Sequence, residues 1–255
     1  MATAMVDGLL GLSPRPVITV AEPDAAKRAL FTAKGVAAVA DNAVAVAAGR
    51  VVVLATKPQA LAQVMPGLAA AWQADRVLVS ILAGATTSRL ASFLPAGARV
   101  VRAMPNTPLA IGQGMVGLCA GAHADAGDLA LAEALFTPCA KVLRVTDEAR
   151  MDAITAVSGS GPAYFFRLAE ALVDAAMSMG FTADEAQLLV GQTGAGAWEY
   201  LLRSGFQAKR LREQVTSPGG TTAAALAVLE AADFTGLWTR ALAAAEQRGR
   251  ELARG

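Results

Sequence analysis

The stretch Val77-Leu78-Val79-Ser80-Ile81 is apolar at nearly every position, and the residues that follow it, 86–93, have the pattern of a short capped helix. A strand that is apolar on both faces is typical of a parallel sheet covered by helices on both sides. Similar apolar runs occur before and after this one. They are residues 17–20, 36–39, 51–54, 100–103 and 115–119.

Helix-like segments separate these runs. Residues 23–32, 58–72 and 86–93 each open with a proline or a threonine, and both residue types are common at helix starts. Strands that alternate with helices in this way predict crossover connections and a doubly wound sheet. We therefore expect a Rossmann-type α/β domain with a parallel sheet over residues 1–146.

The strand pattern ends near Thr146, and residues 147–255 are predicted to form an all-helical domain. In the segment 163–179 the polar residues Arg167, Glu170, Asp174 and Ser178 share one stripe, and the rest of the segment is largely apolar. Such a helix must bury more than one face, so we expect it in the core of a bundle or in an oligomer interface.

Residues 1–12 have the apolar spacing of a helix, and no strand pattern precedes them. A dinucleotide-binding fold needs a first strand and a Gly-x-Gly-x-x-Gly turn at this point, because the amides of that turn bind the pyrophosphate. Neither occurs in the 255 residues. The predicted fold is therefore a Rossmann-type sheet whose first strand is absent from this chain, and we expect that strand and turn immediately before Met1.

The composition excludes several classes of function. Lys and Arg number 22 against 21 Asp and Glu, and neither sign forms a run, which argues against a nucleic-acid partner. His123 is the only histidine, so no metal site is expected. The chain has neither a bilayer-length apolar run nor a secretory signal, which predicts no membrane association and a cytoplasmic location. Cys119 and Cys139 fit reduced thiols in that compartment.

The strongest chemical signal is the stretch Thr216-Ser217-Pro218-Gly219-Gly220-Thr221-Thr222, which leads into a predicted helix over residues 223–232. Its glycines allow the backbone to approach a ligand closely, and the hydroxyls and free amides of the first helical turn favour a bound carboxylate. An ordinary capped helix start is the alternative.

A second stretch of similar type is Ser158-Gly159-Ser160-Gly161-Pro162-Ala163-Tyr164, which opens the apolar helix. Two such helix starts in one helical domain suggest a small acidic substrate. A turn that serves only packing is an equally good interpretation of this stretch.

The third stretch, Met104-Pro105-Asn106-Thr107-Pro108, lies at the carboxyl end of a predicted strand. Ligands in open α/β sheets bind beyond these strand ends, so Asn106 is placed to contact a nicotinamide or a substrate. Thr56 and Lys57 follow another strand at the same edge. Lys57 is as well explained by a solvated charge at a helix start.

Together, in this order and spacing, the three stretches resemble those of pyrroline-5-carboxylate reductases, which catalyse the last step of proline biosynthesis. The resemblance implies NAD(P)H-dependent reduction of 1-pyrroline-5-carboxylate, a small cyclic imino acid, to L-proline, with NADPH or NADH as the cofactor. It also implies that the helical domain builds a homodimer, in some members assembled into a higher homo-oligomer.

The resemblance also assigns site residues. It places the substrate at Ser217, Gly219, Gly220, Thr221 and Thr222, and we hypothesise that the Thr222 hydroxyl acts in catalysis by hydrogen bonding to the ring nitrogen. It places the cofactor at Asn42, Ala55, Thr56, Lys57, Pro58, Ile81, Leu82, Ala83, Asn106 and Gln214.

Three questions stay open from the sequence. Glu22 follows the second strand of the expected fold, where an acidic residue favours NADH, but it is equally explained as an acid near a helix start. One alternative function is a related reductase that acts on another imine or on a β-hydroxyacid. The other is a truncated, non-catalytic homologue that only dimerises.

Overall fold

The computed structural model describes residues 1–254. The chain forms two compact units. The first contains Met1–Pro162 together with the end of the chain from Ala244 onward, and the second is Ala163–Ala243. The predicted domain boundary after residue 146 falls within the first unit, because residues 147–162 pack with the sheet.

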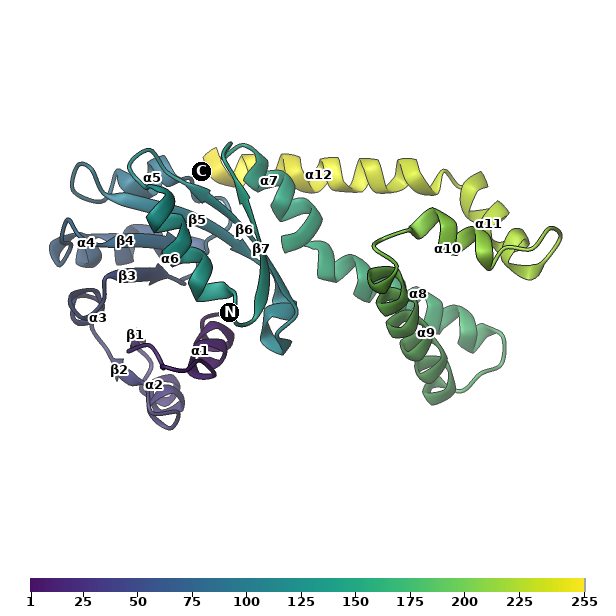
Figure 1. Ribbon diagram of the computed structural model, residues 1–255, viewed down its shortest axis with the longest axis horizontal. Helices are drawn as coiled ribbons and strands as arrows, with labels where there is room; N and C mark the ends of the chain where they lie inside the picture. The colour runs from purple at the N-terminus through teal and green to yellow at the C-terminus, as the bar shows by residue number, and fades with distance from the viewer. Residues whose placement is uncertain (255) are drawn as a thin grey trace. The chain divides into compact units, whose positions relative to one another are not determined.

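The first unit alternates strands and helices, as predicted (Figure 1). Its elements are α1 (Ala2–Leu10), β1 (Thr19–Ala21), α2 (Ala25–Thr32), β2 (Ala37–Val39), α3 (Asn42–Ala48), β3 (Val51–Leu54), η1 (Pro58–Ala60), α4 (Leu61–Ala70), β4 (Val77–Ser80), α5 (Thr87–Ala91), β5 (Arg99–Pro105), η2 (Thr107–Ile111), β6 (Gly114–Ala120), α6 (Ala126–Phe136), β7 (Ala140–Val145), α7 (Arg150–Ile154) and η3 (Thr155–Gly159).

The strands form two sheets, one with the order β1-β2 and one with the order β3-β4-β5-β6-β7. All neighbours are parallel except β5 and β6, which are antiparallel, with Met104 opposite Gly117. The predicted parallel sheet thus contains one antiparallel pair. The segment between Pro105 and Gly114 holds only the short helix η2 and is too short for the crossover that parallel strands need.

The strand order is otherwise that of a doubly wound fold. In such folds the first strand lies between the second and the fourth. Those two strands correspond to β1 and β3, and each has a hydrogen-bonded neighbour on one side only among the described residues. The Rossmann-type fold class is confirmed, with the position of its first strand not filled by any of residues 1–254.

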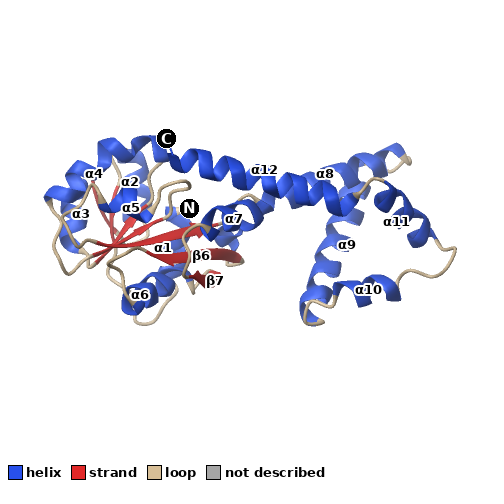
Figure 2. Cartoon of the chain, turned by 90° about the horizontal axis from the view of Figure 1, so that it is seen from above, coloured by secondary structure: helices blue, strands red, loops and turns tan. Residues whose placement is uncertain are grey.

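Helices lie on both faces of the larger sheet (Figure 2), and an apolar cluster packs against each face. On one face Leu78 and Val100 pack with Met65 of α4 and Leu90 of α5. On the other face the alternate residues, such as Val79, join a cluster with α1 and α6. Because strand neighbours point to opposite faces, burial of both sets explains why 77–79 is apolar throughout.

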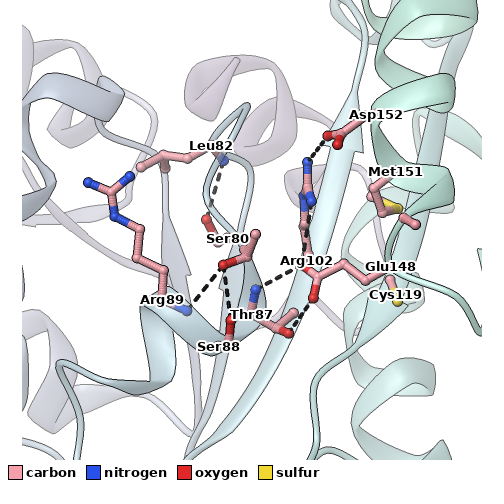
Figure 3. Close-up of polar contacts among 12 residues, drawn as sticks. Ser80, Leu82, Thr87, Ser88, Arg89, Arg102, Cys119, Glu148, Met151 and Asp152 are labelled. Carbon is pink, nitrogen blue, oxygen red and sulfur yellow. Dashed lines mark hydrogen bonds and ion pairs between the residues drawn. The ribbon is translucent and has the colours of Figure 1, made fainter. Parts of the chain in front are cut away.

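A buried ion pair fastens α7 to the sheet (Figure 3). Arg102 of β5 has a side chain only 2% exposed, and its guanidinium lies 2.9 Å from Asp152 and 3.4 Å from Glu148. Glu148 in turn accepts hydrogen bonds from the Thr87 amide, at 2.8 Å, and from the Thr87 hydroxyl, at 2.6 Å. The network thus joins β5, α5 and the segment that leads out of the sheet.

The end of the chain also belongs to the first unit. Leu252 lies against Gly84, where an added Cβ would come within 3.1 Å of the Leu252 Cβ. Gly249 packs in the same way against Asp152, with 3.4 Å between the built Cβ and the Asp152 Cβ. Residues 244–254 therefore cover the carboxylate network of the sheet unit.

The second unit is all helical, as predicted. Its helices are α8 (Gly161–Ser178), which starts at the boundary, α9 (Ala183–Arg203), α10 (Ala208–Gln214), α11 (Thr221–Ala231) and the first part of α12 (Phe234–Arg254), up to Ala243. Aromatic contacts tie these helices together, with ring centroids 5.0 Å apart for Phe165 and Trp198. Tyr164 and Trp238 make a similar contact at 5.6 Å.

Many large apolar side chains of this unit remain exposed in the single chain. Phe166 of α8 is 62% exposed and Leu188 of α9 is 71% exposed. Helix α8 therefore has the apolar surface that its sequence predicts, and one copy of the chain leaves much of that surface uncovered. None of the described helices combines the length and apolarity needed to cross a bilayer.

Candidate functional site

The carboxyl ends of β3, β4 and β5 meet at one edge of the larger sheet, because these strands are parallel. Three groups of predicted cofactor residues follow these strands: Ala55 to Pro58 after β3, Ile81 to Ala83 after β4, and Asn106 after β5. The fold thus brings them to a common edge, the place where open α/β sheets bind ligands.

Thr56 carries an unusual feature at this edge. Its Oγ1 atom is buried and has no hydrogen-bond partner within the described part of the chain. A buried hydroxyl without a partner is unfavourable by about 1–3 kcal/mol, so native proteins rarely keep one unless a ligand or water satisfies it. The residues after β3 therefore fit a bound molecule with a polar group, as a dinucleotide has.

The neighbours of Thr56 are more open. Lys57 is exposed and forms the N-cap of η1, and Pro58 begins that helix.

The predicted cofactor residue Leu82, after β4, is buried. It is 2% exposed, and its amide donates to the Ser80 hydroxyl at 3.3 Å. Figure 3 shows this contact at the turn between β4 and α5.

Asn42 lies apart from these residues, after a strand of the smaller sheet. It is the first residue of α3, and the preceding residue, Asp41, caps that helix through a 2.8 Å bond from the Ala43 amide. Like the other predicted cofactor residues, Asn42 follows the carboxyl end of a parallel strand, β2.

Asn106 is held from two sides. Its Oδ1 accepts from the Met115 amide at 2.9 Å, and its Nδ2 donates to the Ser158 carbonyl oxygen at 3.3 Å and lies 3.4 Å from the Ser158 hydroxyl. Two of the three sequence stretches therefore meet here. Both ends of the Asn106 amide are used within the protein, so this residue fixes the strand end.

The stretch 158–164 differs from its predicted form. Helix α8 does begin at Gly161, with Pro162 in its first turn, but residues 155–159 before it form a π-helical turn that continues α7. The Ser160 amide donates to the Thr155 carbonyl oxygen at 2.8 Å, so it is not free for an anion. A Cβ on Gly159 would clash with Met104 Cε. Gly159 thus packs against the end of the Met104 side chain of β5.

The stretch 216–222 lies in the second unit and leads from the end of α10 into the first turn of α11. Gln214 ends α10, and Gly220 is the N-cap of α11 with no side-chain hydrogen bond to the first turn. Gly219 has a φ of 71°, which favours glycine, and a Cβ on Gly220 would lie 2.6 Å from the Ser217 hydroxyl oxygen. The turn therefore favours glycine at 219 and is tightly packed at 220, and it leaves the helix start without an internal anion.

Two acidic residues that support this edge were not predicted. Glu148 and Asp152 bind the buried Arg102. An arginine within the apolar run 100–103 is the signal that points to them, because a buried guanidinium requires a carboxylate partner. The sequence does not say which of the 21 acidic residues it is.

The described residues offer no catalytic metal and no activated thiol. They contain no group of three or more side chains suited to a metal ion. Burial raises the pKa of the Cys119 thiol, with a smaller contribution from the nearby Glu148 carboxylate. A thiol held in its protonated form is a poor nucleophile.

Comparison with known proteins identifies the family of the chain. A family model described as pyrroline-5-carboxylate reductase dimerisation matches residues 148–252, and one described as NADP oxidoreductase, coenzyme F420-dependent, matches residues 1–84. Pyrroline-5-carboxylate reductase from Pseudomonas aeruginosa is 42% identical over 255 residues, which cover 99% of this chain and 93% of that protein. The chain belongs to the pyrroline-5-carboxylate reductase family.

Solved structures agree with this assignment. A pyrroline-5-carboxylate reductase from Coxiella burnetii, 36% identical, superimposes with a TM-score of 0.91 over 99% of this chain and 94% of that one. The Plasmodium falciparum pyrroline carboxylate reductase, solved with NADP bound, is 25% identical with a TM-score of 0.86, over 98% of this chain and 94% of that one. The family resemblance inferred from the three stretches is therefore confirmed.

Proposed function

We propose that this chain reduces 1-pyrroline-5-carboxylate to L-proline with NADPH or NADH, the last step of proline biosynthesis. The observation that carries the proposal is similarity along almost the whole length to a pyrroline-5-carboxylate reductase, at 42% identity. The sequence keeps all three characteristic stretches, Met104 to Pro108, Ser158 to Tyr164 and Thr216 to Thr222.

The first unit would hold the cofactor at the edge formed by the strand ends. The cofactor supplies a hydride to the imine carbon of the substrate. The Thr56 hydroxyl offers a hydrogen bond that the protein itself does not use. Ala55, Lys57, Pro58, Ile81, Leu82 and Ala83 line the same edge, and Asn42 and Gln214 are the predicted contacts from α3 and α10. Asn106, whose amide is used internally, would act by fixing the end of β5.

The stretch 216–222 would bind the substrate. The amides at the start of α11 are not capped by a side chain, and a helix N-terminus favours a carboxylate. Ser217, Gly219, Gly220 and Thr221 surround that start. The ring nitrogen gains a proton as the carbon gains a hydride, and the Thr222 hydroxyl is proposed to hold a hydrogen bond at this nitrogen. An already electrophilic imine needs little beyond such orientation.

We propose that the chain forms a homodimer or a higher homo-oligomer built from it. Exposed apolar residues such as Phe166 and Leu188 form the surface for a second copy, and the match to a dimerisation family covers the helices that carry them. No nucleic-acid or membrane partner is proposed. We propose a cytoplasmic location, because the free, buried Cys119 and Cys139 suit a reducing compartment.

The decisive experiment measures oxidation of NADPH and NADH by the purified chain with 1-pyrroline-5-carboxylate as the substrate. We expect turnover with this compound, proline-dependent reduction of NAD(P)⁺ at high pH, and far weaker turnover with the same cyclic imine lacking the carboxylate. Equal turnover of the two imines would favour a general imine reductase. A stable dimer that oxidises neither cofactor would favour the non-catalytic alternative.

A further inference from the structure

The loop after β1 carries an arrangement of charges that bears on the choice of coenzyme. Glu22 follows β1 directly, and its Oε1 accepts from the Asp24 amide at 3.0 Å. This bond fixes the side chain against its own loop, and its second carboxylate oxygen, Oε2, accepts no hydrogen bond from the described residues. In doubly wound folds an acidic side chain at the end of the second strand accepts from the 2′-hydroxyl of the adenosine ribose.

The start of the following helix, α2, is already occupied by an internal carboxylate. Asp24 is the N-cap, and its Oδ1 accepts from the Ala26 amide at 2.8 Å and the Lys27 amide at 3.2 Å. These two bonds lower the pKa of Asp24, so it stays ionised at neutral pH. A helix start is the natural site for a phosphate, but here a side chain of the protein fills it with negative charge.

Two cationic side chains, Lys27 and Arg28, lie in the part of α2 that follows this loop, and Arg28 is bound to the loop backbone. Arg28 donates from Nη1 to the carbonyl oxygens of Glu22, at 2.8 Å, and Pro23, at 2.7 Å. The guanidinium is therefore bound to the backbone of its own loop and stiffens the position of Glu22. Lys27 stands exposed in the first turn of α2, next to the Asp24 carboxylate.

We propose that Glu22 makes this reductase selective for NADH over NADPH, by accepting a hydrogen bond from the ribose 2′-hydroxyl and repelling a 2′-phosphate. A phosphate monoester carries nearly two negative charges at neutral pH. Placed beside Glu22 and Asp24 it meets two carboxylates, at a helix start whose Ala26 and Lys27 amides already bind Asp24. The proposal rests on the proposed coenzyme class, NAD(P)H, and not on the identity of the substrate.

The test is calorimetric titration of the full-length protein with NADH and with NADPH, in the absence of substrate. We expect NADH to bind more tightly, on the order of tenfold or more, and we expect the ratio to shrink as salt is added, because the repulsion is between partly exposed charges. Glu22→Gln keeps the size and the acceptor of the side chain and removes its charge. It should bring the two affinities close together, mainly through tighter NADPH binding.

Glu133→Gln is the matched control, since Glu133 is also partly exposed and pairs with Arg144, away from β1. It should leave the ratio of the two dissociation constants unchanged. The proposal would be overturned if the unsubstituted protein bound NADH and NADPH equally well, or bound NADPH more tightly through Lys27. It would also be overturned if Glu22→Gln left the ratio of the two dissociation constants unchanged, or if the protein bound neither coenzyme. A protein that prefers NADH but does not reduce 1-pyrroline-5-carboxylate would keep this inference and refute the proposed function.

Discussion

The Arg102 guanidinium lies 2.9 Å from the Asp152 carboxylate, and this pair joins the middle of β5 to the first turn of α7. Both residues are largely buried, with side chains 2% and 12% exposed. Because α7 continues into the π-helical turn that contacts Asn106 through Ser158, the pair also supports the end of the strand at the proposed cofactor edge.

Removal of one partner from this pair should be strongly destabilising. Asp152→Ala leaves Arg102 buried with only the more distant Glu148, and we expect a loss of about 3 kcal/mol in the free energy of unfolding. Glu133→Ala breaks the exposed pair with Arg144 and should change stability by less than about 1 kcal/mol. Urea denaturation of both variants measures the difference, and equal losses would contradict a special role for the buried pair.

Thr56 should show opposite effects on stability and on binding. Thr56→Val removes the unpartnered hydroxyl at nearly constant volume, so the protein without cofactor should gain about 1 kcal/mol of stability. The same change removes the proposed hydrogen bond to the coenzyme and should weaken NADH binding by roughly tenfold. Thermal unfolding and calorimetric titration test the two parts. Unchanged coenzyme affinity would show that the hydroxyl serves no bound ligand.

Thr222 is proposed to act at the reacting nitrogen, so its loss should lower kcat. For Thr222→Ala we expect a fall in kcat on the order of a hundredfold, as for other groups that assist proton transfer. Thr222→Ser should recover a large part of the activity because it restores the hydroxyl. Thr239→Ala removes a hydroxyl that donates to the Thr235 carbonyl oxygen within α12 and serves as the control. Full activity of Thr222→Ala in steady-state assays would remove Thr222 from the proposed mechanism.

The exposed apolar surface of α8 should be needed for the dimer. Phe166→Asp places a charge where a second copy is expected, and the dimer should weaken by at least about tenfold. Leu30→Asp is the control, since Leu30 of α2 is 63% exposed, like Phe166 at 62%, but belongs to the sheet unit. Light scattering over a range of protein concentrations separates the two variants. A dimer unaffected by Phe166→Asp would place the interface elsewhere.

Gly117 should resist substitution because of close packing. A Cβ at this position would lie 2.8 Å from Ile154 Cγ2, so Gly117→Ala should be destabilising by about 1–3 kcal/mol. Gly67 offers the opposite case, because it is exposed in α4 with nothing within 4 Å of an added Cβ. Gly67→Ala should be stabilising by about 0.5–1 kcal/mol. If denaturant unfolding gave changes in stability of the same sign for both variants, the space around the added Cβ would not explain their effects.

The comparison of sequence and structure shows which features the residues encode locally. The strand predicted at residues 51–54 is β3 to the residue, since an apolar run buried on both faces has a strong signal. β7 (Ala140–Val145) was not among the predicted runs, because it alternates apolar with polar or charged residues and is exposed at several positions. The antiparallel direction of β6 depends on the length of a connection and not on the composition of the strand.

The site could be predicted in part for similar reasons. The alternation of strand and helix patterns in the sequence predicts that Thr56 and Asn106 come directly after strands. The register of the strands confirms that these strand ends share one edge. The contact between Asn106 and Ser158 joins residues far apart in the chain, so no local pattern contains it. The π-helical turn was not predicted, because Ser158, Gly159 and Ser160 have low helix propensity and their helical state depends on packing against β5.

The return of residues 244–254 to the sheet unit has a consequence for biosynthesis. On the ribosome, the residues up to Pro162 emerge long before Leu252, which covers Gly84, and before Gly249, which packs on Asp152. The surface around Gly84 and Asp152 therefore stays exposed on the nascent sheet until α12 has been translated. Ribosome-bound intermediates stalled before residue 244 should be more sensitive to protease at the turn after β4 than the released protein.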